Sequence, residues 1–155
     1  MVQTQVTVNT ASKILIVYVS GSGNTQEVSE IISNELDRRK LNHDICRVGF
    51  TAFPDLSFYD LIFFGSYSIK SDGRVPYLMK EFIKETNFYK PDNIAIFGTG
   101  DTQYKFFCGA ADRLSKFYNS KYPVLKIEQS PRGFQEELIK KWTSEVIEID
   151  KTKAL

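Results

Sequence analysis

The hydrophobic positions along the chain follow two alternating periods, which predicts strands separated by helices. Three segments, 13–19, 61–66 and 93–100, are apolar nearly throughout, and two others, 43–48 and 124–129, alternate apolar with polar residues. Continuous apolar runs are typical of strands covered on both faces, and alternation is typical of less protected edge strands. The first three segments are therefore expected at the centre of a sheet, and the other two at its edges.

Between these segments, apolar residues recur at helical spacing. The expected buried faces are Val28, Ile31, Ile32 and Leu36; Val75, Leu78, Met79, Phe82 and Ile83; Ala110, Ala111, Leu114 and Phe117; and Phe134, Leu138, Ile139, Trp142 and Val146. Alternating strands and helices predict an α/β fold, a three-layer sandwich around a five-stranded parallel sheet. The strand order that puts the alternating segments at the edges is 2-1-3-4-5. A ligand is then expected at the carboxyl ends of strands 1, 3 and 4.

Composition limits the class of protein. The 155 residues are 42% apolar with a net charge of +1, which predicts one ordinary domain over 13–150 and indicates neither a nucleic-acid binder nor a membrane protein. Residues 1–12 are expected to be a loosely ordered polar leader, because they lack the basic start and apolar stretch of a secretory signal. The two cysteines have no paired spacing, so no disulfide or zinc site is expected, which favours a reducing, cytoplasmic compartment.

The loop after the first strand, SGSGNT at 20–25, has the composition of a phosphate site. Its hydroxyl side chains are hydrogen-bond donors, and its two glycines allow close approach to the backbone. Asn24 is expected to cap the following helix, with Glu27 completing a capping box. The free N–H groups at such a helix N-terminus favour a phosphate. The loop matches neither a Walker motif nor GxGxxG, and taken alone it is better explained as an ordinary polar turn.

The loops after the third and fourth strands favour the interpretation of the first loop as a phosphate site. The second loop, 66–76, is long for a strand-to-helix connection and carries Tyr67, Ile69 and the turn-forming pair Asp72-Gly73. The third loop, 98–107, carries Asp101 and Tyr104 between flexible residues. Hydroxyl donors in one loop and apolar or aromatic walls in two others, all at one sheet edge, suit a planar, phosphorylated ligand.

These three loops resemble those of flavodoxins. SGSGNTQEV is similar to their phosphate loop, S/T-x-T/S-G-N-T, and GSYSIKSDGRVP to their second loop, G-x-Y-T-W-G-D-G-x-x-P. GTGDTQYKFFCGAADRL is similar to their third loop, G-x-G-D-x-x-Y-x-x-F-C-x-A-x-D, and is the most specific of the three. The resemblance extends from about residue 13 to 147, with the length of the short-chain form. It implies the flavodoxin-like fold and bound FMN.

The resemblance also implies which residues bind the cofactor. The phosphate would be held by Ser20, Ser22, Gly23, Asn24 and Thr25. Tyr104 would stack on one face of the ring, and the loop over the other face would comprise Ser66, Tyr67, Ser68, Ile69, Lys70 and Ser71. The pyrimidine edge would meet the third loop at Thr99, Gly100, Asp101, Phe107 and Cys108, mainly through backbone groups.

The chain departs from the family pattern in the second loop. Ile69 stands where the family has a tryptophan, and IKSDG replaces W-G-D-G with one extra residue. In the family, a glycine peptide beside flavin N5 flips on one-electron reduction, and here Lys70 or Ser71 would have to turn instead. Non-glycine residues disfavour positive φ. We therefore expect the one-electron-reduced flavin to be less stable than in the family members that stabilise it best.

The resemblance implies a low-potential one-electron carrier that shuttles between a reductase and acceptor proteins, as a monomer in transient complexes. Flavodoxins are typically strongly acidic and this chain is not, so steering toward a basic partner should be weak. No side chain is expected to act in catalysis, since His43 begins an edge strand and has no triad partners. The alternative is a flavodoxin-like activator of manganese ribonucleotide reductase of class Ib, which uses reduced FMN and oxygen.

Overall fold

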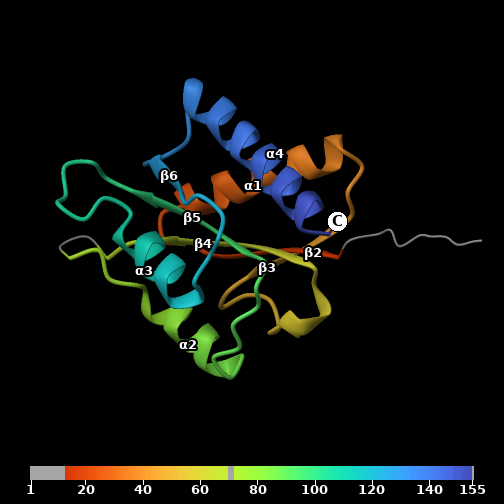
Figure 1. Cartoon of the computed structure of the whole chain (residues 1–155). Coiled ribbons are helices and arrows are strands. Elements are labelled where there is room, and N and C mark those ends of the chain that lie inside the picture. Colours follow the sequence, from red (N-terminus) through yellow and green to blue (C-terminus); the bar gives the residue numbers. More distant parts are fainter. Residues whose placement is uncertain (1–12, 70–71, 155) are drawn as a thin grey trace, which may run out of the picture.

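Five parallel strands form one sheet within the residues that the computed structural model describes, 13–69 and 72–154 (Figure 1). The predicted leader, 1–12, lies outside the described residues. The strands are β2 (Ile14–Val19), β3 (His43–Arg47), β4 (Leu61–Tyr67), β5 (Ile94–Gly100) and β6 (Leu125–Glu128). Their order across the sheet is β3-β2-β4-β5-β6. In chain order this is 2-1-3-4-5, so the predicted topology is confirmed.

Burial along the strands follows the hydrophobic pattern. Every residue of β2 is buried, as are the first six residues of β4 and of β5. The edge strands are only partly covered: β6 alternates buried with half-buried residues, and Ile45 of β3 is exposed. Strands covered on both faces need apolar side chains at successive positions, which explains why the three central strands read as continuous apolar runs.

Helices cover both faces of the sheet (Figure 1). On one face lie α1 (Asn24–Arg38) and α4 (Phe134–Ala154), and on the other lie α2 (Tyr77–Glu85) and α3 (Gly109–Tyr118), with a short 3-10 turn, η1 (Leu56–Phe58), before β4. The core accordingly has two parts, one on each side of the sheet. None of the described helices combines the length and the apolar character that crossing a bilayer requires.

Three residues expected in the buried helix faces are exposed. Leu78 is 42% exposed, Leu138 40% and Phe134 80%. Each lies at the margin of an apolar stripe that is wider than the surface facing the sheet, and Phe134 is the first residue of α4. Their neighbours Met79 and Ile139 are fully buried instead. The prediction of their burial was wrong because helical spacing gives the centre of a stripe more reliably than its edges.

Trp142 packs in the core, as expected. It makes edge-to-face contacts with Phe63 and Phe97, and its indole Nε1 donates to the carbonyl oxygen of Pro123 at 2.6 Å. A buried tryptophan needs such an acceptor for its N–H group. This residue is therefore part of the α4 packing and does not line the cavity described below.

Candidate functional site

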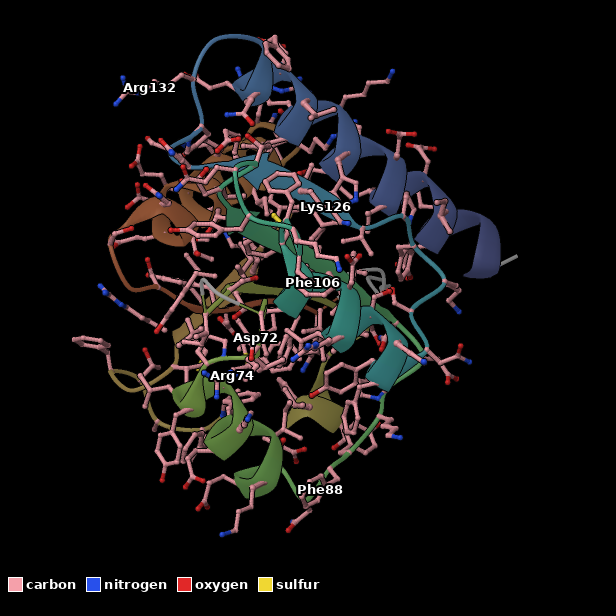
Figure 2. All side chains as sticks on the ribbon, turned by 90° about the vertical axis from the view of Figure 1, so that its left-hand side faces the viewer. Asp72, Arg74, Phe88, Phe106, Lys126 and Arg132 are labelled. Carbon is pink, nitrogen blue, oxygen red and sulfur yellow. The ribbon has the colours of Figure 1, made fainter. Side chains whose placement is uncertain are left out.

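A cavity of about 690 Å³ opens at the carboxyl ends of β2, β4 and β5, where the three loops of interest meet. Cavities of this size are typical of cofactor sites. Figure 2 looks onto the side of the molecule on which Phe106, Asp72 and Arg74 from the second and third loops lie together. The lining residues are Gly21, Ser22, Asn24, Thr25, Tyr67, Ser68, Ile69, Thr99, Gly100, Asp101, Tyr104, Phe106, Cys108 and Gln129.

The first loop leads into α1 through Gly23, not through an asparagine cap. Gly23 is the N-cap with φ of +103°, a left-handed conformation that glycine adopts without strain, and Asn24 is already helical. As the N-cap residue, Gly23 has no side chain that could cap this helix, and the carboxylate of Glu27 instead accepts from Ser130 Oγ. The predicted capping box is therefore wrong, because a residue that has entered the helix cannot reach its first N–H groups as an N-cap does.

This geometry leaves hydrogen-bond donors free at the start of α1. The N–H of Gln26 donates to Ser20 Oγ at 3.3 Å, and that of Glu27 to the carbonyl oxygen of Gly23 at 3.0 Å. Within the described chain, no group accepts from the backbone N–H of Asn24 or Thr25, both of which line the cavity. Free N–H groups at a helix N-terminus, beside the hydroxyl of Ser22, form an arrangement that favours an anion.

Two buried hydroxyl groups join the first loop to the centre of the sheet. Thr25 Oγ1 and Thr99 Oγ1 are 2.8 Å apart, although 74 residues separate them in the sequence. Thr25 is in the first turn of α1, and Thr99 is near the carboxyl end of β5. Both residues line the cavity, so the first loop and the strand that leads into the third loop are in direct contact there.

The second loop folds back as a small hairpin over the cavity. The N–H of Ile69 donates to the carbonyl oxygen of Arg74, and the N–H of Gly73 to that of Ile69, both at 2.9 Å. Ser68 Oγ accepts from the N–H of Ala110 at 2.9 Å, which ties the loop to the start of α3. The predicted residues Lys70 and Ser71 lie outside the described residues, so which peptide approaches the ligand stays a prediction.

The aromatic ring of Tyr67 lies against the first loop. A Cβ built on Gly21 would be 3.4 Å from this ring, which is ordinary van der Waals contact. The ring therefore forms a wall between the first and second loops, and both residues line the cavity.

The third loop is held by hydrogen bonds to its own backbone, to the last residue of β6 and to the residue that follows it. Asp101 accepts from the N–H of Gln103 at 3.0 Å and from Gln129 Nε2 at 3.2 Å, and the carboxylate of Glu128 accepts from the N–H of Thr102. Tyr104 is half-buried and Phe106 is 47% exposed at the rim. The loop thus presents aromatic side chains on a backbone that is tied to the sheet.

Cys108 closes this loop and precedes α3. A Cβ on Gly100 would lie 2.9 Å from its backbone nitrogen, so glycine allows the loop to return close to the end of β5. The thiol is buried, and burial raises the pKa of Cys108 to about 12. The side chain is therefore a protonated packing group, with its Sγ 3.9 Å from the carbonyl oxygen of Ile127, and any polar contact of Cys108 with a ligand would be made by its backbone.

Four of the predicted residues that the structure describes do not line the cavity. The Ser66 hydroxyl is buried and donates to the carbonyl oxygen of Tyr67, and Phe107 packs against the core between the sheet and helices α2 and α3. Ser20 and Gly23 shape the turn behind the cavity instead. Contact between these residues and a ligand stays a prediction.

Three lining residues were not predicted to bind. Gly21 and Phe106 lie inside the loops that the sequence indicated, so their position in those loops was the available signal. Gln129 follows β6, and sequence analysis expected ligand contacts only after strands 1, 3 and 4. The imidazole of His43 is at the amino end of β3, where its Nε2 lies 2.7 Å from Ser33 Oγ, so it takes no part in this site.

The cavity combines an anion-binding corner with a ring-binding slot. The first loop supplies N–H groups and hydroxyls, and the other two loops supply tyrosine, phenylalanine and isoleucine side chains. These donors suit a dianionic phosphate, and these walls suit a flat, largely apolar ring. The described residues of the site therefore fit a phosphorylated flavin.

Comparisons with known proteins agree with this geometry. The family model described as Flavodoxin matches residues 16–122. "Probable flavodoxin 2" of Bacillus subtilis (strain 168) is 32% identical over 141 residues, covering 81% of this chain and 88% of the relative. "Flavodoxin" of Maridesulfovibrio salexigens is 31% identical over 111 residues, covering 68% and 75%. The crystal structure of oxidised Flavodoxin 2 from Bacillus cereus superimposes with a TM-score of 0.80 at 28% identity, over 88% of this chain and 99% of that one.

Proposed function

The chain belongs to the flavodoxin family, and we propose that it binds one FMN in this cavity and carries single electrons at low potential from a reductase to acceptor proteins. One observation carries the proposal: the start of α1, with the free N–H groups of Asn24 and Thr25, meets the aromatic second and third loops around a single cavity. When bound, FMN supplies the electron-accepting ring, and the protein supplies position and electrostatics.

The phosphate would lie in the first loop. The free N–H groups of Asn24 and Thr25 and the hydroxyls of Ser22 and Thr25 surround that corner. The partial positive charge at the helix N-terminus favours a dianion without a neighbouring lysine or arginine. Ser20 and Gly23 would contribute by holding the turn, since the Ser20 hydroxyl accepts from the N–H of Gln26.

The ring would lie between the second and third loops. Tyr104 would stack on one face, and the loop that begins at Ser66 and Tyr67 would cover the other, with Ile69 in place of an aromatic residue. The backbone of Gly100, Asp101 and Cys108 would meet the polar edge. The hydrogen bonds of Asp101 to Gln103 and Gln129 support this, because they hold the third loop in place before a ligand arrives.

The partners would be redox proteins that bind transiently to the exposed rim of the cavity. Two acidic side chains, one in the second loop and one in α3, are paired with cations: Asp72 with Arg74 at 2.9 Å, and Asp112 with Lys126 at 2.8 Å. With a net charge of +1, the chain offers little long-range attraction to a basic partner. The docking face would therefore depend on apolar contact at Phe106 more than on charge.

The cellular setting would be the cytoplasm, with the protein acting as a monomer. Both cysteines are buried and free, which suits a reducing compartment. The relatives reported above are named as flavodoxins, not as activators of ribonucleotide reductase, so that alternative stays a prediction from the sequence.

Titration of the flavin-free protein with FMN tests the proposal. We expect the fluorescence of FMN to be quenched with a stoichiometry of one FMN per chain. Adenosine monophosphate, which has a phosphate but no flavin ring, serves as the control ligand and should not compete. Absence of FMN binding by folded protein would overturn the proposal.

A further inference from the structure

The pair formed by Thr25 and Thr99 is a deeply buried polar contact in the wall of the cavity. The two side chains are 1% and 2% exposed, and their Oγ1 atoms are 2.8 Å apart. In the part of the chain that the structure describes, neither hydroxyl has another hydrogen-bond partner. Each group therefore keeps unused hydrogen-bonding capacity beside the cavity that both residues line.

Which oxygen donates in this pair depends on what else is bound. A threonine hydroxyl has one proton and two lone pairs, and at this contact either oxygen can be the donor. A phosphate dianion only accepts. If Thr25 donates its one proton to such an oxygen, its own oxygen is left to accept, and Thr99 is the group placed to donate to it.

We propose that Thr99 is a positioning residue that makes the cavity select a phosphorylated flavin over the unphosphorylated one. Its hydroxyl donates to Thr25 Oγ1 and thereby directs the Thr25 proton to the phosphate. The inference rests on the proposed function, since it takes the flavin phosphate to lie in the first loop. It assigns a role to the Thr99 side chain, whereas the sequence indicated only backbone contact near this residue.

The position of Thr99 suits this role because its backbone is fixed. It lies in the parallel ladder between β4 and β6, in register with Tyr67 and Ile127. Its hydroxyl is therefore positioned by a strand that is hydrogen-bonded on both sides. In a buried site, successive hydrogen bonds that point toward an anion strengthen one another. An unphosphorylated flavin offers no anion at this corner, so the Thr99 hydroxyl has nothing to contribute to its binding.

The test compares FMN and riboflavin binding to the purified, flavin-free protein and its variants by fluorescence titration. T99V removes the hydroxyl and nearly conserves volume, and T99S restores a hydroxyl. T143V is the matched control, because Thr143 is also fully buried and donates from Oγ1 to a backbone oxygen, that of Ile139, but lies in α4 away from the cavity. The visible spectrum of each variant saturated with FMN reports on the surroundings of the ring.

We expect T99V to bind FMN about tenfold more weakly, a change of about 1.4 kcal/mol, with the riboflavin affinity and the ring spectrum unchanged. T99S should recover most of the FMN affinity, and T143V should bind both flavins like the wild type. Three results would overturn the proposal: an unchanged FMN affinity in T99V, an equal loss for both flavins, or a loss that T99S does not recover. If riboflavin binds too weakly to be measured, the proposal is decided by two results: the recovery of FMN affinity in T99S, and the unchanged visible spectrum of T99V saturated with FMN. Wild-type protein that binds neither flavin would instead refute the proposed function.

Discussion

The backbones of Gly73 and Gly109 are in direct contact: a Cβ on Gly109 would lie 2.9 Å from the Cα of Gly73. Gly73 ends the hairpin of the second loop with φ of +69°, and Gly109 is the first residue of α3. Arg113 of the same helix donates to the carbonyl oxygen of Asp72 at 3.1 Å. The start of α3 therefore sets the height of the second loop over the cavity.

G73A should move this loop and weaken FMN binding. A Cβ there would meet Phe106 Cβ at 2.8 Å, and the left-handed backbone adds strain. We expect a stability loss of about 1–3 kcal/mol in chemical unfolding and an FMN affinity lower by at least about tenfold, which is about 1.4 kcal/mol. G133A is the matched control, because Gly133 also has positive φ, +54°, but a Cβ there meets nothing within 4 Å. Equal FMN affinities in the two variants would contradict the role assigned to the glycine contact.

Substitutions of two aromatic residues should change stability in one case and cofactor binding in the other. Trp142 is buried between α4 and the sheet, whereas Tyr104 lines the cavity. W142F should lower the free energy of unfolding by about 1–3 kcal/mol and leave the FMN affinity unchanged. Y104L should leave the free energy of unfolding unchanged and weaken FMN binding, because ring stacking of about 0.5–1.5 kcal/mol is lost only in the complex. A W142F variant that loses FMN affinity while still folded would show that Trp142 does more than pack.

The two thiols should be unreactive in the folded protein. Burial raises the pKa of Cys46 to about 11 and that of Cys108 to about 12, so neither forms the thiolate that reacts. We expect no labelling by a disulfide reagent at pH 8 until denaturant is added, and two labelled thiols afterwards. One thiol that reacts rapidly in the folded protein would be inconsistent with this burial.

The same raised pKa values predict the direction of alkaline destabilisation. In the unfolded chain, both thiols lose their protons near the ordinary pKa of about 8.5, whereas the folded state retains them to higher pH. The stabilisation is fully present below that pKa and is lost as the pH rises toward the folded values. Chemical unfolding at a series of pH values should therefore show a free energy of unfolding that falls above about pH 9. A free energy of unfolding that increases above about pH 9 would contradict the predicted direction.

Electron transfer to a basic protein should depend little on salt. With a net charge of +1, the chain offers little long-range attraction to a basic protein, and Asp72 and Asp112 are each paired with a cation. We expect the rate at which the reduced protein reduces a basic c-type cytochrome to change by less than about threefold between low and physiological salt. A steep fall in rate with added salt, measured by stopped-flow absorption, would reveal an acidic docking face.

Much of the fold could be predicted because burial on both sides of a parallel sheet leaves a clear sequence pattern. The central position of β4 follows from its continuous apolar run, and the edge position of β3 from alternation. Burial at the edges of the apolar helix faces could not be predicted in this way, because Leu78 and Phe134 fit the helical spacing and yet are exposed. Whether a marginal position is covered depends on how each helix sits against its neighbours, which local spacing does not contain.

The site was predictable where its residues belong to loops at one sheet edge. Most of the predicted residues of these loops line one cavity. Gln129 escaped prediction because it reaches the cavity from beyond an edge strand, and the Thr25–Thr99 contact because it joins α1 to a strand that is not adjacent to β2. The start of α1 was predicted wrongly because Gly23, in a left-handed conformation, begins the helix one residue earlier than an Asn24 cap would. The sequence of this loop does not distinguish the two starts.

Stepwise anaerobic reduction of the purified protein, followed by visible absorption, tests the central claim most directly. We predict the two bands of oxidised flavin at the outset, in the protein as isolated or after FMN is added. At half reduction a long-wavelength band should appear, without reaching full yield, before the flavin bleaches completely. Protein that shows no flavin bands even with added FMN would contradict the assignment of the cavity, and bleaching without the intermediate band would contradict single-electron transfer.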